Sequence, residues 1–482
     1  MEFSSLYFLY LFLPLTLLVY FLVPGLRLKN IVLLAASLLF YAMGQPVYVL
    51  LLVGLSYANF AMARRIRPGK RNTLFLPVVV NLAVLGLFKY LDFFLGIFGI
   101  TVADGGVMLA ALRGITNGLN SIGFAFRSPT SALPLGLSFY AFQVISYVAD
   151  VYRGKVKAER SFFNLLLYLS MFPKMMQGPI VRYEQVARQL MDRRTTPRAA
   201  FEGAQRFIIG LAKKVLLADY AGKVVASLST GGGNGTFVGA WLAALMFMFQ
   251  IYFDFSGYSD MAIGIARIFG FHLDENFRHP FLCKDITEFW QRWHISLGTF
   301  FRDYLLYVPL FGKRRKIGGL LLVWFCTGLW HGASWNYIIW GIYYGLFLML
   351  EMGIGKKGMK KIPAVLRHLC NKIVIIVGFG IFYCTGGIDQ LGDMLLAMAG
   401  QNSTGWLDTM LVTSVQNNLF LLIAALLCCF PLLELPKKIM AKNPAANVAL
   451  SVTGTVLAAG LLVISSILMV DATNTPFLYT KF

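Results

Sequence analysis

Apolar segments follow one another along almost the whole chain, and this pattern constrains what it can fold into. Of the 482 residues, 58% are hydrophobic and only 13% are charged. A soluble chain of this length carries about 25% charged residues and could not hide so much apolar surface from water. The sequence therefore predicts an all-α protein that crosses a membrane several times. The apolar segments lie near 6–24, 31–43, 47–63, 74–98, 132–151, 161–177, 206–228, 237–270, 318–331, 337–353, 373–386, 416–434 and 446–469.

Basic residues are concentrated in the short loops between these segments. The 43 Lys and Arg outnumber the 22 Asp and Glu and give a net charge of +21. Basic loops of this kind lie on the cytoplasmic side of membrane proteins, so the charge indicates orientation and not a nucleic-acid partner. If every basic loop is cytoplasmic, both ends of the chain lie outside, including an extracytoplasmic tail at 471–482.

One apolar segment, 161–177, cannot cross fully on this assignment because basic loops flank it on both sides. It runs into FPKMMQGP at 172–179, where two prolines and a glycine interrupt a helix. We therefore expect a re-entrant piece enclosed by protein.

Other sequence features favour one membrane domain over residues 1–482. We find no internal repeat and no long polar linker.

The first apolar run, 6–24, lacks a basic leader and is expected to be a retained helix. The six cysteines show no C-x-x-C spacing, so we predict neither a disulfide framework nor a metal site.

His331 lies in the apolar, Trp-rich stretch WFCTGLWHGASWNYIIW at 324–340. An ionisable residue at membrane depth is a candidate functional group, and histidine can move a proton near neutral pH. The residues after it, including Asn336, can turn the chain back, which would place His331 near the tip of a buried helical hairpin. A structural histidine bonded to a carbonyl is the alternative, and both interpretations stay open.

Two further polar groups stand out in apolar surroundings. His294 lies among aromatic and charged residues at 289–316, which predicts either the rim of a tunnel mouth or an interfacial helix. Asp254, Tyr258 and Asp260 lie within IYFDFSGYSDMAIGIARIFGF at 251–271. Asp254 and Tyr258 share a helix face and could line a polar cavity, orient a catalytic histidine or clasp two helices together.

The chain ends in FLYTKF, with Tyr479 in the predicted extracytoplasmic tail. A phenol can accept an acyl group, and it is a better leaving group than an alkyl alcohol. Tyr479 could therefore carry an acyl group in transit. An interfacial aromatic tail is the alternative interpretation.

Five ordered blocks of the sequence resemble the membrane-bound O-acyltransferase family, above all its bacterial branch, typified by the alginate O-acetylation membrane protein. They span 134–341, which we take as the family core. The blocks are PLGLSFYAFQVISYVADVYRG (134–154), MFPKMMQGPIVRYEQV (171–186), IYFDFSGYSDMAIGIARIFGF (251–271), FWQRWHISLGTFFRDYLLYVPL (289–310) and TGLWHGASWNYIIWG (327–341).

The resemblance implies a ring of tilted helices around a tunnel or funnel, with re-entrant and amphipathic helices. It places the family's catalytic histidine at His331 and its second histidine at His294. It implies a cytoplasmic thioester donor such as acetyl-CoA, no permanently bound cofactor, and a separate extracytoplasmic polysaccharide acetyltransferase as partner. The F-x-Y-x-x-F ending of the branch is matched by the tail, except that Thr480 replaces an expected phenylalanine.

These features together predict an O-acyltransferase of a bacterial cytoplasmic membrane that supplies acetyl groups for an extracytoplasmic polysaccharide. His331 is the expected general base. Asn336 or an indole N–H nearby, such as that of Trp330, is the expected oxyanion donor. D-alanyl transfer to teichoic acid and, in another class, a proton-coupled exporter are the alternatives. The sequence leaves the polymer open, whether alginate, cellulose, peptidoglycan or another glycan.

Overall fold

The described part of the chain is helical throughout. The structure is a computed structural model that describes residues 2–100, 106–123, 128–129, 131–230, 235–306, 316–401, 403–432, 439, 444–471 and 476–478. These residues form helices and no strand, which confirms the predicted all-α class.

Seven of the described helices are long and apolar enough to cross a membrane, and an eighth span results if the bent pair α20 (Thr409–Asn417) and α21 (Leu419–Cys428) counts as one. The protein is therefore a multi-pass membrane protein, as predicted. The spans are α2 (Gly25–Gly44), α3 (Pro46–Ala63), α4 (Asn72–Lys89), α13 (Phe237–Ile268), α17 (Trp335–Lys361), α18 (Ala364–Tyr383) and the stretch Ala446–Val470 of α23 (Pro444–Asp471).

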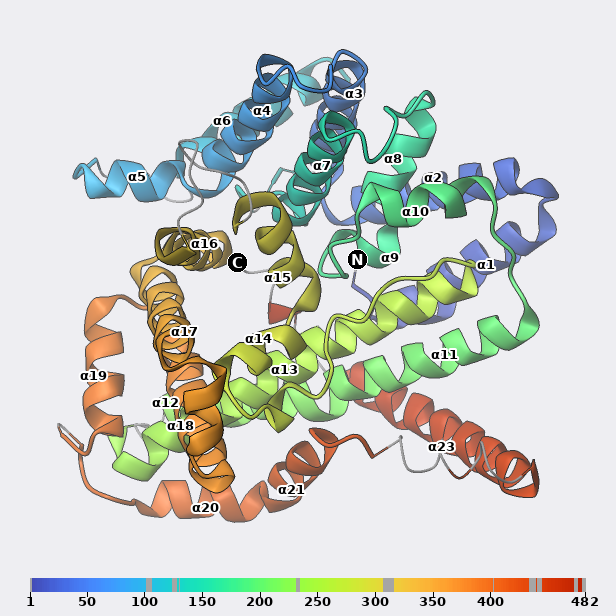
Figure 1. Ribbon diagram of the computed structural model, residues 1–482. Helices are drawn as coiled ribbons and strands as arrows, with labels where there is room; N and C mark the ends of the chain where they lie inside the picture. Colours follow the sequence, from blue (N-terminus) through green and yellow to red (C-terminus); the bar gives the residue numbers. More distant parts are fainter. Residues whose placement is uncertain are drawn as a thin grey trace. The chain divides into compact units, whose positions relative to one another are not determined.

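The chain packs into two compact units, Met1–Ala204 with Ala262–Asp274, and Gln205–Met261 with Glu275–Phe482. Figure 1 shows the helices, coloured along the sequence. Two long helices, α11 (Pro197–Ala212) and α13, have residues in both units. Besides α2 to α4, the first unit contains η1 (Phe8–Phe12), α1 (Leu13–Leu22), α5 (Leu91–Ile97), α6 (Gly106–Ser121), α7 (Leu137–Tyr152), α8 (Phe162–Ser170), α9 (Phe172–Met175) and α10 (Tyr183–Met191).

The second unit carries the residues predicted to act in chemistry. Besides α17, α18 and α23, its elements are η2 (Lys213–Ala218), α12 (Asp219–Thr230), η4 (Pro280–Leu282), α14 (Ile286–Arg292), α15 (Ile295–Phe301), η5 (Arg302–Leu306), α16 (Lys316–His331), α19 (Ile388–Met398), α20 (Thr409–Asn417) and α21 (Leu419–Cys428). The single domain over 1–482 and the ring of helices around a tunnel stay predictions.

The segment 161–177 is broken within the first unit, as its prolines and glycine predict. Helix α8 ends at Ser170, and Met171 leaves the helical region with φ −49° and ψ 108° before the four-residue α9. Phe172 then packs against Phe12 and Phe40, with ring centroids 5.5 and 5.6 Å apart. The break is confirmed and is enclosed by protein, while its failure to cross the membrane stays a prediction.

Helices α16 and α17 form a tightly packed hairpin in the second unit. A Cβ added at Gly328 would lie 2.3 Å from the carbonyl oxygen of Tyr337, and one added at Gly341 would lie 2.3 Å from that of Trp324. The two backbones are therefore in direct contact, as small residues permit between membrane helices. The turn after His331 confirms the hairpin predicted from the sequence.

We expect Gly341→Ala to destabilise the protein, because its methyl group would enter the space of the Trp324 carbonyl. Overpacking of this kind costs about 1–3 kcal/mol. Gly353→Ala is the matched control in the same helix, since nothing lies within 4 Å of its Cβ position. Thermal unfolding of the purified variants should show a lower melting temperature for Gly341→Ala alone. Equal melting temperatures would contradict the direct backbone contact.

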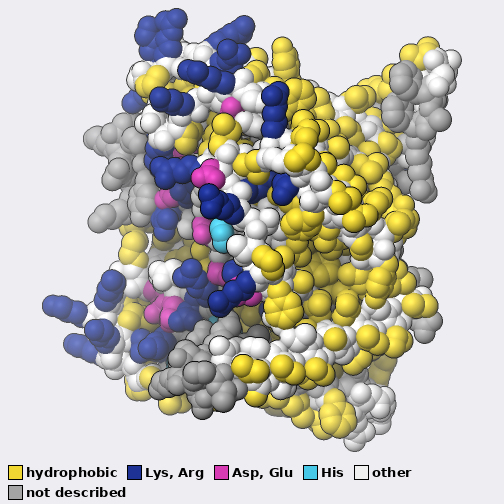
Figure 2. Space-filling view, turned by 90° about the vertical axis from the view of Figure 1, so that its right-hand side faces the viewer, with side chains coloured by type: hydrophobic (Ala, Val, Ile, Leu, Met, Phe, Trp, Pro, Cys, Tyr) yellow, Lys and Arg dark blue, Asp and Glu magenta, His cyan; other side chains and the backbone are white. Residues whose placement is uncertain are grey.

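The surface reflects a membrane environment. Large apolar side chains on α23 are exposed, with Val448, Val456 and Val470 between 65 and 70% accessible. Figure 2 shows hydrophobic side chains over a broad part of the face that it draws, and Lys and Arg side chains gathered in separate clusters. Exposed apolar side chains on a candidate span are accounted for by contact with lipid.

Candidate active site

His331 is the last residue of α16 and lies deep in the second unit. At a rise of 1.5 Å per residue, it stands about 22 Å from the start of this helix at Lys316. The helix is too short for a full crossing, which needs about 20 residues. The side chain of His331 is buried, with 3% of the residue exposed. Its place at the tip of a buried hairpin is as predicted.

Three aromatic rings enclose the imidazole of His331. The ring centroids of Trp330, Trp340 and Phe382 each lie 5.0 Å from it, at interplanar angles of 74°, 83° and 81°. Such edge-to-face contacts are favourable and fix the plane of the ring. The enclosure therefore holds a histidine in one orientation and keeps bulk water away from it.

The indole N–H of Trp340 is a buried donor with no acceptor among the described residues. The same holds for Trp290, whose ring centroid lies 5.4 Å from that of Trp340. Leaving a buried donor unsatisfied costs about 1–3 kcal/mol, so such a group calls for an explanation. An oxygen of a bound substrate next to His331 would supply the missing acceptor.

Asn336 takes a different part in the site. Its side chain is buried, and Nδ2 donates to the carbonyl oxygen of Phe382 at 3.1 Å. The bond connects the first turn of α17 to the end of α18 and helps to place the Phe382 ring beside His331. Its predicted role as an oxyanion donor stays a prediction.

His294 lies at the junction of α14 and α15 in left-handed backbone geometry, with φ 44° and ψ 54°. This geometry is uncommon for residues other than glycine and is found more often at functional sites. The imidazole is buried, 4.6 Å from the ring of Phe255 and 5.9 Å from that of Trp330. The two histidines thus contact the same indole, and their ring centroids are at most about 11 Å apart.

Asn276 determines which nitrogen of His294 carries the proton. Its Oδ1 accepts from the backbone N–H of Ser296 at 3.2 Å and from the Ser296 hydroxyl at 2.9 Å, which identifies this atom as the oxygen. The Nδ1 of His294 lies 3.1 Å from the same oxygen and must donate to it. Nε2 therefore carries the lone pair and is the basic atom of His294.

Burial also keeps His294 neutral. It lowers the pKa of His294 to about 3 because the charged imidazolium would lose its hydration. A neutral imidazole at physiological pH can accept a hydrogen bond at Nε2.

A carboxylate on α17 fixes the helix that leads to His294. Glu351 accepts from the backbone N–H groups of Ile286 and Thr287 at 2.6 and 2.9 Å, at the start of α14. These are the N–H groups that a helix leaves unsatisfied, and the negative charge suits this end of it. Glu351 thus anchors the segment bearing His294 to the hairpin that bears His331.

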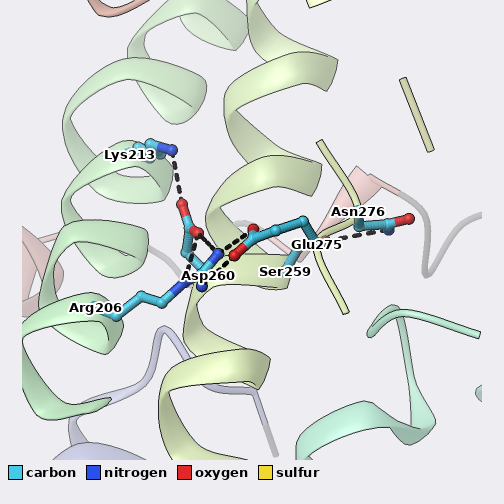
Figure 3. Close-up of polar contacts among 6 residues, drawn as sticks. All are labelled: Arg206, Lys213, Ser259, Asp260, Glu275 and Asn276. Carbon is cyan, nitrogen blue, oxygen red and sulfur yellow. Dashed lines mark hydrogen bonds and ion pairs between the residues drawn. The ribbon is translucent and has the colours of Figure 1, made fainter. Parts of the chain in front are cut away.

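A network of charges holds the loop that carries Asn276 (Figure 3). Arg206 binds Asp260 at 2.8 Å and Glu275 at 2.5 Å, and Lys213 binds the other oxygen of Asp260 at 2.7 Å. Glu275 is next to Asn276 in sequence, and Asn276 donates to Ser259 of α13 at 3.3 Å. The network therefore positions Asn276, which in turn orients His294.

The two predicted carboxylates of α13 form ion pairs. Asp260 binds Arg206 and Lys213, while Asp254 is 1% exposed and binds Lys214 at 2.8 Å. This geometry matches the clasp between helices that the sequence left open. The roles of Asp254, Tyr258 and Asp260 as cavity or orienting residues stay predictions. Tyr479 lies outside the described residues.

Sequence reasoning missed Asn276, Lys213 and Lys214. Asn276 follows two acidic residues in a loop, where nothing local signals a partner 18 residues away. A signal did exist for the lysines, because two adjacent cations inside the apolar run 206–228 require buried anions. Pairing them with the carboxylates of 251–271 would have predicted the contact.

Comparison with known proteins identifies the family of the chain. The profile of the membrane-bound O-acyltransferase family, MBOAT, matches residues 156–386. The chain is 39% identical to the probable alginate O-acetylase AlgI of Pseudomonas syringae, over 79% of this chain and 72% of that protein. It is 32% identical to the peptidoglycan O-acetyltransferase of Helicobacter pylori, over 83% of this chain and 80% of that protein.

A teichoic acid D-alanyltransferase of Bacillus subtilis is 28% identical over 52% of this chain and 67% of that protein. The matched family region contains both buried histidines, Asn276 and the α16–α17 hairpin. The chain therefore belongs to the membrane-bound O-acyltransferase family and is a membrane acyltransferase.

Proposed function

We propose that the chain takes an acetyl group from a cytoplasmic acyl thioester such as acetyl-CoA for O-acetylation of an extracytoplasmic polysaccharide. The similarity to an alginate O-acetylase and to a peptidoglycan O-acetyltransferase supports the acetyl group and a glycan. The D-alanyltransferase is less similar and matches only 52% of the chain, so acetyl transfer is favoured over alanyl transfer.

The observation that carries the proposal is the enclosed imidazole of His331 beside the ring of Trp340, whose indole N–H has no acceptor among the described residues. His331 takes the proton of the acceptor hydroxyl as its oxygen bonds to the thioester carbonyl carbon. The Trp340 N–H donates to the oxyanion. When the C–S bond breaks, the imidazolium returns its proton to the departing thiolate, which completes the transfer. His294 accepts a hydrogen bond from the donor side through Nε2.

The first acceptor in this proposal is the phenol of Tyr479. Its ester is more reactive than an alkyl ester, so the acetyl group can pass on to an extracytoplasmic partner acetyltransferase and then to the polymer. A hydroxyl of the partner or of the polymer itself is the alternative acceptor. The donor is made in the cytoplasm and the polymer lies outside, which requires a bacterial cytoplasmic membrane as the location.

The test is to identify the group that reaches the polymer. Mass spectrometry of envelope polysaccharide from cells with and without the gene should show acetyl esters only when the chain is present. Purified protein should also hydrolyse acetyl-CoA slowly. Alanyl esters in place of acetyl esters would contradict the proposed donor. Proton-driven solute uptake into vesicles without thioester turnover would contradict the enzyme.

A further inference from the structure

The end of the chain returns to the middle of α13. Asp254 lies 17 residues after the first residue of this helix and 14 before its last, or roughly 20–25 Å from either end. The backbone N–H of Leu478 donates to Oδ2 of Asp254 at 2.9 Å. Two residues of the tail are therefore seated at the centre of a candidate membrane span.

Phe477 occupies a defined place there and is 1% exposed. Its ring meets the Tyr258 ring edge to face, with centroids 5.1 Å apart and planes at 89°. The ammonium of Lys214 lies 4.8 Å from the centroid of the Phe477 ring, within cation–π distance. Asp254 and Tyr258 lie on one face of α13. On this face Asp254 binds the N–H of Leu478, and Tyr258 packs against Phe477.

Lys214 connects these contacts into one unit. It binds Oδ1 of Asp254 at 2.8 Å and Oδ1 of Asp219 at 2.7 Å, and it is almost fully buried. A buried cation needs such anions, and two carboxylates leave one oxygen of Asp254 for the tail. The close approach of Gly210 to Gly257, where an added Cβ would lie 2.5 Å from the carbonyl oxygen, brings η2 near enough to α13 for the ion pair.

We propose that Lys214, Asp254 and Asp219 form a tail latch, which holds the C-terminal segment of this chain inside the second unit through Phe477 and Leu478. Asp254 and Lys214 are positioning residues in this scheme. In sequence, Tyr479 directly follows the anchored Leu478. Any contribution of the latch to acyl transfer rests on the proposed function of Tyr479. The latch itself rests only on the contacts of Phe477 and Leu478 with α13 and Lys214.

The two carboxylates of the latch differ in a way that permits a matched test. Lys214 and the Leu478 N–H bind different oxygens of Asp254, and in Asp254→Asn one of these oxygens becomes an NH₂ group that cannot accept, so one of the two contacts is lost at its present position. Asp219→Asn removes the same charge, and its remaining oxygen can still bind Lys214. The bond from the Leu478 N–H goes to Asp254 and is kept. Only the first variant should release the tail.

Hydrogen–deuterium exchange of the purified full-length protein, measured on C-terminal peptides by mass spectrometry, follows this release. In the wild-type protein and in Asp219→Asn, the Leu478 N–H should exchange slowly because it is hydrogen-bonded. In Asp254→Asn and in Phe477→Ala, it should exchange about tenfold faster or more, the scale of a hydrogen bond to a charged group. Phe477→Ala changes only the tail, so it stays informative if Asp254→Asn folds poorly. Equal rates in the wild type and Phe477→Ala would overturn the latch.

Tyr479→Phe separates the latch from the proposed function. We expect this variant to keep the slow exchange of the Leu478 N–H and to lose polymer acetylation. Normal acetylation by Tyr479→Phe, with protection retained, would reject the tyrosine relay and still support the latch. Rapid exchange of the Leu478 N–H in every protein, the wild type included, would reject the latch whatever the level of acetylation.

Discussion

Replacing His331 with alanine should reduce acyl transfer by about 10²–10⁴-fold, the usual contribution of a positioned general base. The imidazole is the ionisable group at the tip of the α16–α17 hairpin, and three aromatic rings hold it in one plane. Without it, the acceptor hydroxyl must lose its proton unaided. Turnover of acetyl-CoA by purified protein and acetyl content of the polymer both measure the effect.

His272→Ala is the control for this experiment, because His272 is exposed and lies outside the site. Protein level and monodispersity in detergent should match the wild type for both variants. If His331→Ala acetylated the polymer normally at equal protein level, the assignment of the general base would be wrong.

Part of this site could be predicted from local sequence. The hairpin follows from a short apolar helix, a Gly-Ala-Ser turn and a second apolar helix, all between 318 and 353. The break at 172–179 follows from its prolines and glycine. The shared face of Asp254 and Tyr258 follows from helical periodicity alone. Each of these features depends on residues that lie close together in the sequence.

The rest depends on contacts between segments far apart in the chain. Asn276 determines the tautomer of His294 only because the Arg206 network holds its loop. Leu478 meets Asp254 across 224 positions of sequence. The amino-acid sequence shows that these groups are polar and lie in apolar surroundings. It does not show which partner satisfies each one.

The shared contact of Trp330 gives the two histidines a physical connection. His331 and His294 come from different helices, and each packs against this one indole. A change in the position of the Trp330 ring would alter both imidazoles together. Glu351 reinforces the arrangement, since it anchors α14 to the helix that follows His331. The two imidazoles are therefore positioned by one set of packed side chains and not by independent loops.

Replacing Trp340 with phenylalanine should lower the acyl-transfer rate by about 10²–10³-fold, the range for loss of one oxyanion donor. Phenylalanine keeps an aromatic ring beside His331 and removes the indole N–H, which has no acceptor among the described residues. The smaller ring leaves part of the space of the buried indole empty, so the melting temperature should fall, and removal of the unsatisfied donor should offset part of this loss.

Trp241→Phe is the matched control, since its indole N–H already donates to the carbonyl oxygen of Met398 at 3.0 Å. This variant should lose stability, because the Met398 oxygen loses its donor, and should keep its transfer rate. Trp340→Phe should lower both the melting temperature and kcat. A fall in kcat that Trp241→Phe does not share identifies a donor that acts on the transition state and not one that only holds helices together. Normal turnover in Trp340→Phe would show that the oxyanion is stabilised by another group, and Trp290→Phe would be the next variant to measure.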